Sequence, residues 1–198
     1  MASITLLRHG ETAWSLSGQH TGRTDIPLTD NGRERAKKVA PLLAGHKFGL
    51  VLTSPLSRAK DTAELAGLKS DGTDDDLLEW DYGAYDGLTT AQIREQLNDP
   101  TWVIWGAKIP PGKTPGETTD EVGVRCARVI ARCTPFLDKG EDCALVAHGH
   151  LLRILTATWV GLPSIDGQKF ALEPGALSTL GFEHETHVLT AWNITPQS

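Results

Sequence analysis

Two short apolar segments, far apart in the chain, each lead directly into a histidine that is followed by glycine. Residues 3–7 precede Arg8, His9 and Gly10, and residues 144–147 precede His148 and Gly149. Apolar runs of this length that end at glycine predict buried strands followed by a loop or a helix. Open α/β sheets place their chemistry at the carboxyl ends of such strands. The two histidines are therefore predicted to meet at one edge of a parallel sheet.

A third strand is predicted over residues 50–52, followed by a helix with an arginine in its first turn. Ser54 is a suitable N-cap and Pro55 a suitable first helical residue. Arg58 then lies near the strand end, where a helix N-terminus also favours an anion. We therefore expect Arg58 to reach the same sheet edge as the two histidines.

Residues 77–83 predict another extended approach to this edge, and it carries the carboxylate of Glu79. If these strands are parallel neighbours, five side chains converge there: Arg8, His9, Arg58, Glu79 and His148. A cluster that holds two arginines and two histidines suits an anion. A lone Arg-His-Gly would support such a site only weakly, and the repetition of the arrangement strengthens it.

The order of the predicted elements indicates the fold class. Helices are predicted after Thr29, Thr89 and Thr118, which are suitable N-caps, and the last two begin capping boxes. Extended segments are predicted near the C-terminus, over residues 169–172, 176–182 and 187–192. We therefore expect an α/β protein with a single domain over residues 1–198. Its architecture is a three-layer α/β/α sandwich whose mostly parallel central sheet has an antiparallel edge strand.

Some segments fit this pattern less well. Pro41 lies inside the helix predicted after Thr29 and is expected to kink or shorten its last turn. The three aspartates at 74–76 are interpreted as a solvated charge run rather than a metal site. Residues 101–117 are rich in proline and glycine and predict a loop or a lid, with Trp102 and Trp105 packing it down rather than walling a pocket.

Taken in this order, the motifs resemble those of the histidine phosphatase superfamily, also called phosphoglycerate-mutase-like, over nearly the whole chain. They lie at residues 8–12, 21–32, 54–63, 79–83, 116–118 and 147–149. Trp14, residues 17–22 and residues 79–87 look most similar to the acid phosphatase and sedoheptulose-bisphosphatase-like branch. The resemblance implies the same three-layer fold and a phosphatase that acts on small phosphorylated metabolites.

The resemblance also assigns roles to the residues that match the motifs. It places Arg8, His9, Arg58 and His148 in a phosphate pocket and gives Glu79 the acid and base work. Segments that shape the substrate site in relatives hold six further residues: Ser15, His20, Thr21, Gly22, Trp80 and Tyr82. Backbone donors near Gly149, where a helix is predicted to begin, would assist in binding the phosphate.

These residue types suit phosphoryl transfer. His9, with a neutral ring nitrogen aimed in line, would attack phosphorus and form a phosphohistidine, which divides one hard step into two. The arginines would bind the equatorial oxygens, and a protonated His148 would add a donor. Glu79 has to carry a proton for the leaving group, a state that burial and a neighbouring phosphate favour. Glu11 and Asp81 compete for this role by type, although Glu11 better fits a loop support. The scheme requires no metal and no cofactor.

Two other functions stay open. A phosphoglycerate mutase shares this pocket, but the full-size mutases have a longer segment after the Glu-x-x-Tyr-Gly element and a C-terminal tail that closes the site. Few residues follow Trp192 here. A catalytically silent phosphate-binding module is disfavoured because all five pocket residues are present.

Composition limits the partners. The formal net charge of −6 argues against a nucleic-acid partner, which would need a basic face. No apolar run approaches the roughly 18 residues that cross a bilayer, and the N-terminal segment lacks a signal-peptide pattern. We interpret Cys126, Cys133 and Cys143 as reduced core thiols. We expect a cytoplasmic protein whose partner is a small phosphate ester, and a homo-oligomer stays open.

Overall fold

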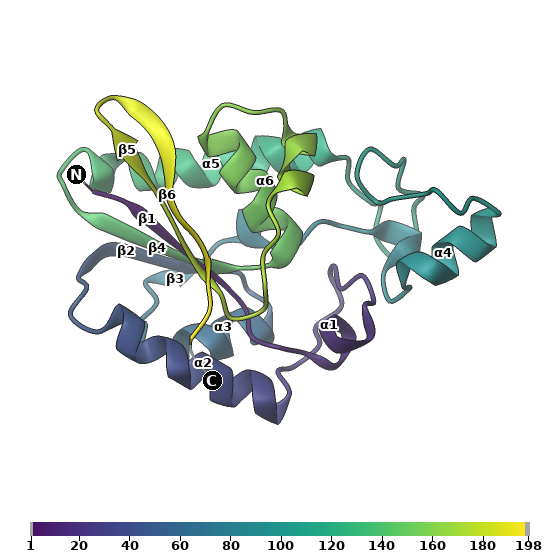
Figure 1. The fold of residues 1–198 in the computed structure, drawn as a ribbon, viewed down its shortest axis with the longest axis horizontal. Helices are drawn as coiled ribbons and strands as arrows, with labels where there is room; N and C mark the ends of the chain where they lie inside the picture. The colour runs from purple at the N-terminus through teal and green to yellow at the C-terminus, as the bar shows by residue number, and fades with distance from the viewer. Residues whose placement is uncertain (1, 197–198) are drawn as a thin grey trace.

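The computed structural model describes residues 2–196, and its centre is a six-stranded sheet (Figure 1). The strands lie in the order β3-β2-β4-β1-β5-β6. Their bounds are β1 Ile4–Arg8, β2 Phe48–Thr53, β3 Gly72–Thr73, β4 Asp142–Ala147, β5 Leu177–Glu183 and β6 Thr186–Ile194. The strands β1 to β4 are parallel to one another. In contrast, β5 runs antiparallel to β1, and β6 runs antiparallel to β5. The predicted mostly parallel sheet with an antiparallel edge is confirmed.

Helices cover both faces of the sheet, so the molecule has the three predicted layers (Figure 1). On one face lie α2 (Asp30–Leu43) and α3 (Ser57–Leu65), and on the other lie α5 (Thr119–Leu137) and α6 (Gly149–Trp159). Because successive strand side chains point to opposite faces, each strand feeds two cores.

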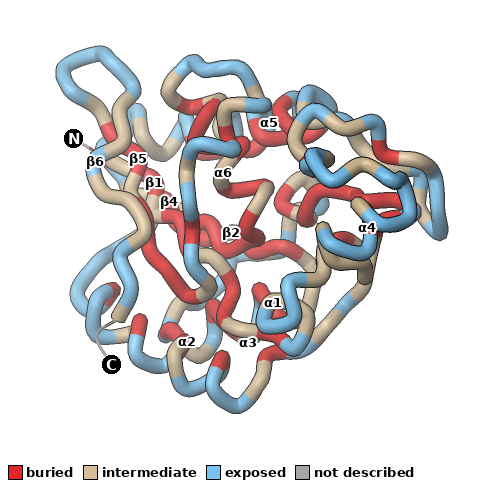
Figure 2. Tube along the Cα trace, turned by 45° about the vertical axis from the view of Figure 1, so that its right-hand side comes forward, coloured by how far each residue is buried: buried red, intermediate tan, exposed pale blue. Residues whose placement is uncertain are grey.

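The two cores differ in size. The smaller one packs Leu7 and Val146 against α2 and α3. The larger one packs Leu6 and Leu145 against α5 and α6, and it also contains all three cysteines, whose thiols are free. Figure 2 shows β4, most of β1 and most of α6 as buried segments at the centre of the molecule, whereas the edge strand β6 is not buried.

Smaller elements lie around this frame. Beyond the carboxyl ends of the parallel strands lie α1 (Ala13–Ser17) and α4 (Thr90–Leu97) (Figure 1). Three 3-10 turns complete the fold: η1 Asp75–Leu77, η2 Gly83–Tyr85 and η3 Ser164–Lys169. No helix in residues 2–196 combines the length and the apolar character needed to cross a membrane.

The predicted N-caps are confirmed. The hydroxyls of Thr29, Thr89 and Thr118 each accept a hydrogen bond from a backbone N–H in the first turn of α2, α4 and α5. The two capping boxes are complete, because the side chains of Gln92 and Glu121 each accept a hydrogen bond from the backbone N–H of the N-cap residue. Each box satisfies backbone donors that a helix start leaves without partners.

One predicted helix start is wrong, and one of the two effects expected of Pro41 is absent. The third helix begins at Ser57 rather than Pro55, and its N-cap, Leu56, makes no side-chain hydrogen bond. The hydroxyl of Ser54 contacts the ring of His148 instead, a long-range partner that outweighs the local cap. Pro41 does not shorten α2, which continues to Leu43.

The extended approach predicted for residues 77–83 is also wrong. The strand β3 ends at Thr73, and Glu79 follows the turn η1 in an irregular segment. The aspartates of this turn are not a solvated run, because Asp76 pairs with Arg128 and Arg132 of α5 and Asp74 pairs with Arg132. The extended segment predicted over residues 169–172 is the end of η3 and a loop.

The segment over residues 101–117 forms neither a helix nor a strand, as predicted. The ring of Trp105 lies edge-on against Trp80, with centroids 5.5 Å apart, and Trp102 lies against Tyr85 at 5.3 Å. Both tryptophans therefore pack this segment onto the larger core, as predicted.

Candidate active site

The sheet brings the two His-Gly segments together at adjacent strand ends. Arg8 and Ala147 are register partners in the parallel pair β1 and β4, so His9 and His148 leave the sheet side by side. The backbone N–H of His9 donates to the carbonyl of Ala147 at 2.9 Å. The two imidazole centroids lie 5.1 Å apart. The predicted meeting of the histidines is confirmed.

His9 is held as a neutral ring with one nitrogen available. Its side chain is buried, and Nδ1 lies 2.7 Å from the carbonyl oxygen of Gly10. Because a carbonyl only accepts hydrogen bonds, Nδ1 carries the proton and Nε2 keeps its lone pair. Burial lowers the pKa of His9 well below its ordinary value, and the charges of Arg58 and Arg8 lower it further. His9 thus has the tautomer that a nucleophile needs.

Arg58 is fully buried and fixes His148 from the α3 side. Its Nε donates to Nδ1 of His148 at 3.2 Å, while its terminal nitrogens donate to the carbonyls of Gly22 and Thr24, both at 3.0 Å. The opposite ring nitrogen of His148, Nε2, lies 2.7 Å from the hydroxyl of Ser54.

This arrangement holds His148 neutral. Its Nδ1 accepts from Arg58, and its pKa lies well below the ordinary value because of burial first and the charge of Arg58 second. The protonated His148 expected from the sequence would place a second donor opposite Arg58 Nε. A doubly protonated His148 therefore requires that this hydrogen bond break, whereas the neutral ring can still donate through its Nε2–H, which lies beside Ser54.

Arg8 has a buried nitrogen that no protein atom satisfies. One terminal nitrogen donates to the carbonyl of Leu172, but Nε makes no hydrogen bond within residues 2–196. The first residue of α6, Gly149, lies directly against this guanidinium, and a Cβ there would come within 3.1 Å of its Cζ. Glycine at this position therefore lets Arg8 and the N-terminus of α6 face one ligand.

Glu79 is buried and bound to the start of α6. Its Oε1 accepts from the backbone N–H groups of Trp80 and Leu151 at 2.9 and 2.8 Å, and Oε2 accepts from that of His150 at 3.0 Å. The carboxyl group is thus held beside the residue that follows Gly149.

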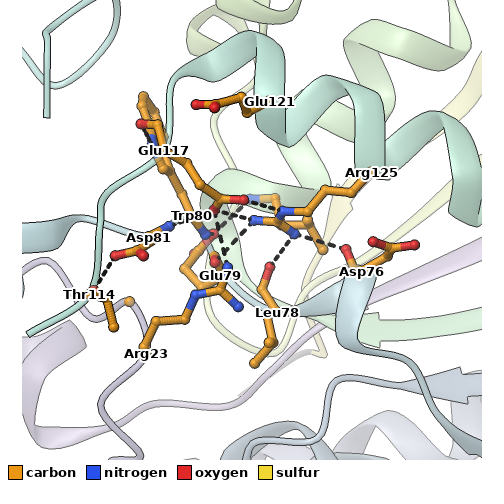
Figure 3. Close-up of polar contacts among 12 residues, drawn as sticks. Arg23, Asp76, Leu78, Glu79, Trp80, Asp81, Thr114, Glu117, Glu121 and Arg125 are labelled. Atoms are coloured by element: carbon orange, nitrogen blue, oxygen red, sulfur yellow. Dashed lines mark hydrogen bonds and ion pairs between the residues drawn. The ribbon is translucent and has the colours of Figure 1, made fainter. Parts of the chain in front are cut away.

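The main chain around Glu79 is held from behind by Arg125 of α5 (Figure 3). This buried guanidinium donates to the carbonyls of Asp76, Leu78 and Glu79 at 2.8, 2.6 and 3.1 Å. It also forms a two-pronged ion pair with Glu117 at 2.8 and 2.9 Å. The network orients the segment that carries Glu79, although none of its other members lines the cavity described below.

The other candidate acids have structural partners. Glu11 accepts from the side chains of Thr29 and Asn31 and so connects the first loop to the start of α2, as predicted. Asp81 accepts from the backbone N–H of Gly83 and from the hydroxyl of Thr114 (Figure 3). Neither carboxylate lines the cavity.

A cavity of about 110 Å³ opens between these groups. It is lined by Arg8, His9, Ser15, Gln19, His20, Thr21, Glu79, Tyr82, Gly149, His150 and Arg153. Among residues 2–196, no three histidine, cysteine, aspartate or glutamate side chains lie close enough to hold a metal ion.

Four residues expected at the site do not line this cavity. Arg58 and His148 lie outside the lining, where Arg58 is hydrogen-bonded to His148 and the ring of His148 lies 5.1 Å from that of His9. Trp80 is fully buried and donates its indole N–H to the carbonyl of Glu117, so its role is packing. Gly22 donates its N–H to Asp86 and accepts from Arg58 through its carbonyl.

Three aromatic residues form the outer part of the cavity. The hydroxyl of Tyr82 is hydrogen-bonded to Nδ1 of His150, and His20 lies against Tyr82 with centroids 5.1 Å apart. Burial lowers the pKa of His20 to about 4 and that of His150 well below its ordinary value. This part of the cavity therefore binds through neutral rings.

Sequence reasoning missed Gln19, His150 and Arg153. Gln19 follows the helix α1 and donates to the carbonyl of Gly87. His150 directly follows His148 and Gly149, but a strand-end pattern alone does not assign it to the site. A signal for Arg153 exists in the sequence, because it follows Gly149 by four residues and so lies on the same face of α6.

Comparison with known proteins agrees with this geometry. The family model of the histidine phosphatase superfamily, branch 1, matches residues 4–195. An acid phosphatase of Mycobacterium tuberculosis is 39% identical over 194 residues, which cover 97% of this chain and 92% of that protein. The sedoheptulose 1,7-bisphosphatase of Saccharomyces cerevisiae is 37% identical over 195 residues, covering 82% of this chain and 70% of the yeast protein.

Comparison of the fold with solved structures points to the same family. The solved structure of the open reading frame Rv3214 from Mycobacterium tuberculosis superposes with a TM-score of 0.91 at 39% identity, and the match covers 99% of both chains. The family model and these relatives span nearly all of the residues that build the cavity. The chain therefore belongs to branch 1 of the histidine phosphatase superfamily.

Proposed function

We propose that this chain is a metal-independent phosphatase that hydrolyses small phosphomonoesters, such as sugar phosphates, through a phosphohistidine on His9. The single observation that carries the proposal is the state of His9. Its Nδ1 is bonded to the carbonyl of Gly10, its pKa is lowered by burial and by the charges of Arg58 and Arg8, and its Nε2 keeps a lone pair. The phosphatase relatives support the same reaction class.

In the first step the substrate phosphate takes the place that Arg8 and the start of α6 face. The guanidinium of Arg8 and the backbone N–H of Gly149 compensate the charge on its equatorial oxygens, because the N–H groups of His150 and Leu151 bind Glu79. Nε2 of His9 attacks phosphorus while the bond to the ester oxygen breaks. Glu79, beside Gly149, donates its proton to the departing alkoxide, which leaves as the alcohol.

In the second step the ionised Glu79 accepts a proton from water. The resulting hydroxide attacks the phosphohistidine, the P–N bond breaks, and Nε2 regains its lone pair. Inorganic phosphate leaves, and Glu79 carries a proton again. Two in-line displacements thus return every group of the site to its starting state.

The test is phosphate release by the purified protein in excess chelator, with sugar monophosphates, sugar bisphosphates, phosphoglycerates and an aryl phosphate. His9→Ala is expected to lower turnover by several orders of magnitude, and a cooperative urea unfolding transition shows that the variant is folded. The wild-type protein should acquire an acid-labile phosphoryl label that the variant lacks. His46→Ala, at an exposed histidine far from the cavity, is the control.

The outcomes separate the alternatives. Turnover of His9→Ala within a few-fold of wild type would remove the nucleophile assignment. Interconversion of phosphoglycerate isomers without phosphate release indicates a mutase. Binding of esters without turnover of any of them indicates a phosphate-binding module.

A further inference from the structure

The cavity contains a third arginine that the proposed chemistry does not use. Arg153 lies on α6 one turn after Gly149, and both residues line the cavity. Residues four apart lie on the same face of a helix. Arg153 therefore faces the cavity beside the place where the phosphate is expected to bind.

The guanidinium of Arg153 is fixed without an ion pair. Its Nε donates to the carbonyl of Gly167 at 3.1 Å, and its Nη2 donates to that of Gln168 at 3.0 Å. Its Cζ lies 4.7 Å from the ring centroid of Trp105. Within residues 2–196 it has no carboxylate at ion-pair distance, and its Nη1 makes no hydrogen bond. The group is rigid, charged and available on one edge.

Arg125 shows how this chain satisfies a guanidinium that serves structure alone. That group has a carboxylate partner, Glu117, in addition to its three carbonyl acceptors. Arg153 has two carbonyls and an aromatic ring, and no neutralising carboxylate. A partly buried cation without a counter-charge is costly unless a ligand supplies that charge.

The arginines that line the cavity are Arg8 and Arg153, whereas Arg58 lies outside it and has Asp25 3.9 Å away. Arg8 and Gly149 mark the place expected for the transferred phosphate, and Arg153 lies one helical turn farther along α6. A second anionic group of the substrate would supply the counter-charge that Arg153 lacks. The field of Arg153 reaches the middle of the site, because it lowers the pKa of the Tyr82 hydroxyl as Arg8 and Arg58 do, against the larger effect of burial.

We infer that Arg153 binds a second anionic group of the substrate, so that the preferred esters carry a carboxylate or another phosphate besides the phosphate that is transferred. The inference rests on the proposed function. The planar fork of arginine suits both groups, and Trp105 keeps it oriented toward the cavity.

The experiment compares substrates that differ only in the second group. Glycerol 3-phosphate is paired with 3-phosphoglycerate, in which a carboxylate replaces the terminal CH₂OH, and fructose 6-phosphate is paired with fructose 1,6-bisphosphate. Wild type should prefer the second member of a pair. Arg153→Gln should lower kcat/KM for the preferred member by about 10- to 100-fold and change the neutral-tailed member by less than about 3-fold, since a hydrogen bond to a charged group is lost.

Two further variants make the comparison specific. Arg153→Lys keeps the charge without the fork and should retain an intermediate preference. Arg94→Gln is the matched control, because Arg94 also donates to a backbone carbonyl, that of Trp102, but does not line the cavity. The ratio of kcat/KM within a pair does not depend on the fraction of folded enzyme, so a loss of stability cannot imitate the effect.

The outcomes are distinct. If Arg153→Gln lowers both members of each pair equally, or neither, Arg153 is a structural residue and the inference is wrong. If the wild type releases phosphate from no ester, the proposed function fails. Calorimetric titration of the same four esters into wild type and Arg153→Gln then decides the subsite, because only an anion site at Arg153 makes the variant lose affinity for the doubly anionic member alone.

Discussion

At the scale of single residues, the reactivity proposed for His9 depends on one backbone carbonyl. Gly10 presents that carbonyl to Nδ1, and its own N–H donates to the hydroxyl of Thr62. A Cβ at Gly10 would come within 2.7 Å of the carbonyl oxygen of Gly32, at the start of α2. The glycine of the Arg-His-Gly motif is thus required for the close packing of this loop, and the packed loop selects the tautomer of His9.

Glu79 offers a second test at this scale. Glu79→Gln removes the proton that the leaving alkoxide needs, so turnover of an alkyl phosphate should fall by about 10²- to 10⁴-fold. An aryl phosphate, whose leaving group is a weaker base, should lose much less. The measurement is kcat for both esters with wild type and variant.

The control for Glu79→Gln is Glu11→Gln. Glu11 supports the first loop through Thr29 and Asn31, so its loss should affect both esters alike. Equal losses with Glu79→Gln would assign Glu79 a structural role, because an acid must distinguish good leaving groups from poor ones.

At the scale of elements, the first turn and a half of α6 contributes to several parts of the site. His148 is its N-cap, Gly149 lies against Arg8, the N–H groups of His150 and Leu151 hold Glu79, and Arg153 lines the cavity one turn later. A helix N-terminus presents several N–H donors in one direction. The helix therefore organises the nucleophile side and the acid side of the cavity with a single rigid element.

The helix α5 performs the matching task behind Glu79. Arg125→Met would leave Glu117 without its two-pronged partner and three buried carbonyls without a donor (Figure 3). We expect the free energy of unfolding to fall by about 3 to 5 kcal/mol, the usual cost of breaking a buried ion pair from one side. Urea unfolding measures the loss, and kcat for an alkyl phosphate should fall with it because Glu79 is less well positioned.

Arg128→Met is the control for this prediction. Arg128 lies on the same helix and pairs with Asp76, but its side chain is 54% exposed. Its loss should cost less than about 1 kcal/mol, as for other surface ion pairs. If the two variants unfold at the same urea concentration, the network around Arg125 does not hold the Glu79 segment.

Whether a prediction from the sequence succeeded depends on how far apart in the chain the interacting residues lie. The caps at Thr29, Thr89 and Thr118 bind N–H groups within three residues, so a local pattern predicts them. The predictions for Ser54 and Asp76 were wrong because the partners of these residues are distant in sequence. Ser54 contacts His148, the N-cap of α6, and Asp76 pairs with Arg128 of α5. Such partners become visible only when the sheet has assembled.

The same distinction applies to the site. The convergence of Arg8, His9 and His148 follows from strand ends and was predicted. Arg153 was missed because its only signal, a spacing of four residues from Gly149, identifies a cavity side chain only once Gly149 is known to line the cavity. The predicted roles of the site residues stay predictions until the variants above are measured.

At the scale of the whole molecule, an acidic protein encloses a basic cavity. The formal net charge is −6, yet three arginines face or support the cavity together with one carboxylate. The surrounding histidines are neutral, because burial lowers the pKa of His9, His20, His148 and His150. Positive charge is therefore local and carried by arginine, whose charge does not change with pH in the physiological range.

These four histidines make stability depend on pH. In the unfolded chain a histidine binds a proton as the pH falls below about 6.5, whereas in the folded protein these rings resist protonation, His20 until about pH 4. The unfolded state therefore binds more protons, and the free energy of unfolding falls as the pH falls. Each such histidine contributes up to about 1.4 kcal/mol per pH unit in this window.

Urea unfolding from about pH 7.5 to about pH 5 measures the effect. Carboxylates whose pKa values are lowered by ion pairs, such as Asp76, become protonated only at more acid pH and do not contribute in this range. The wild type should lose stability steadily below about pH 6.5. His20→Gln should make the free energy of unfolding depend less steeply on pH. The reduction corresponds to the uptake of at most one proton, because one neutral ring is removed and the other three remain. A stability that stays constant or rises over this range would show that the buried rings accept protons in the folded state, and the neutral His9 on which the proposed reaction depends would then be excluded.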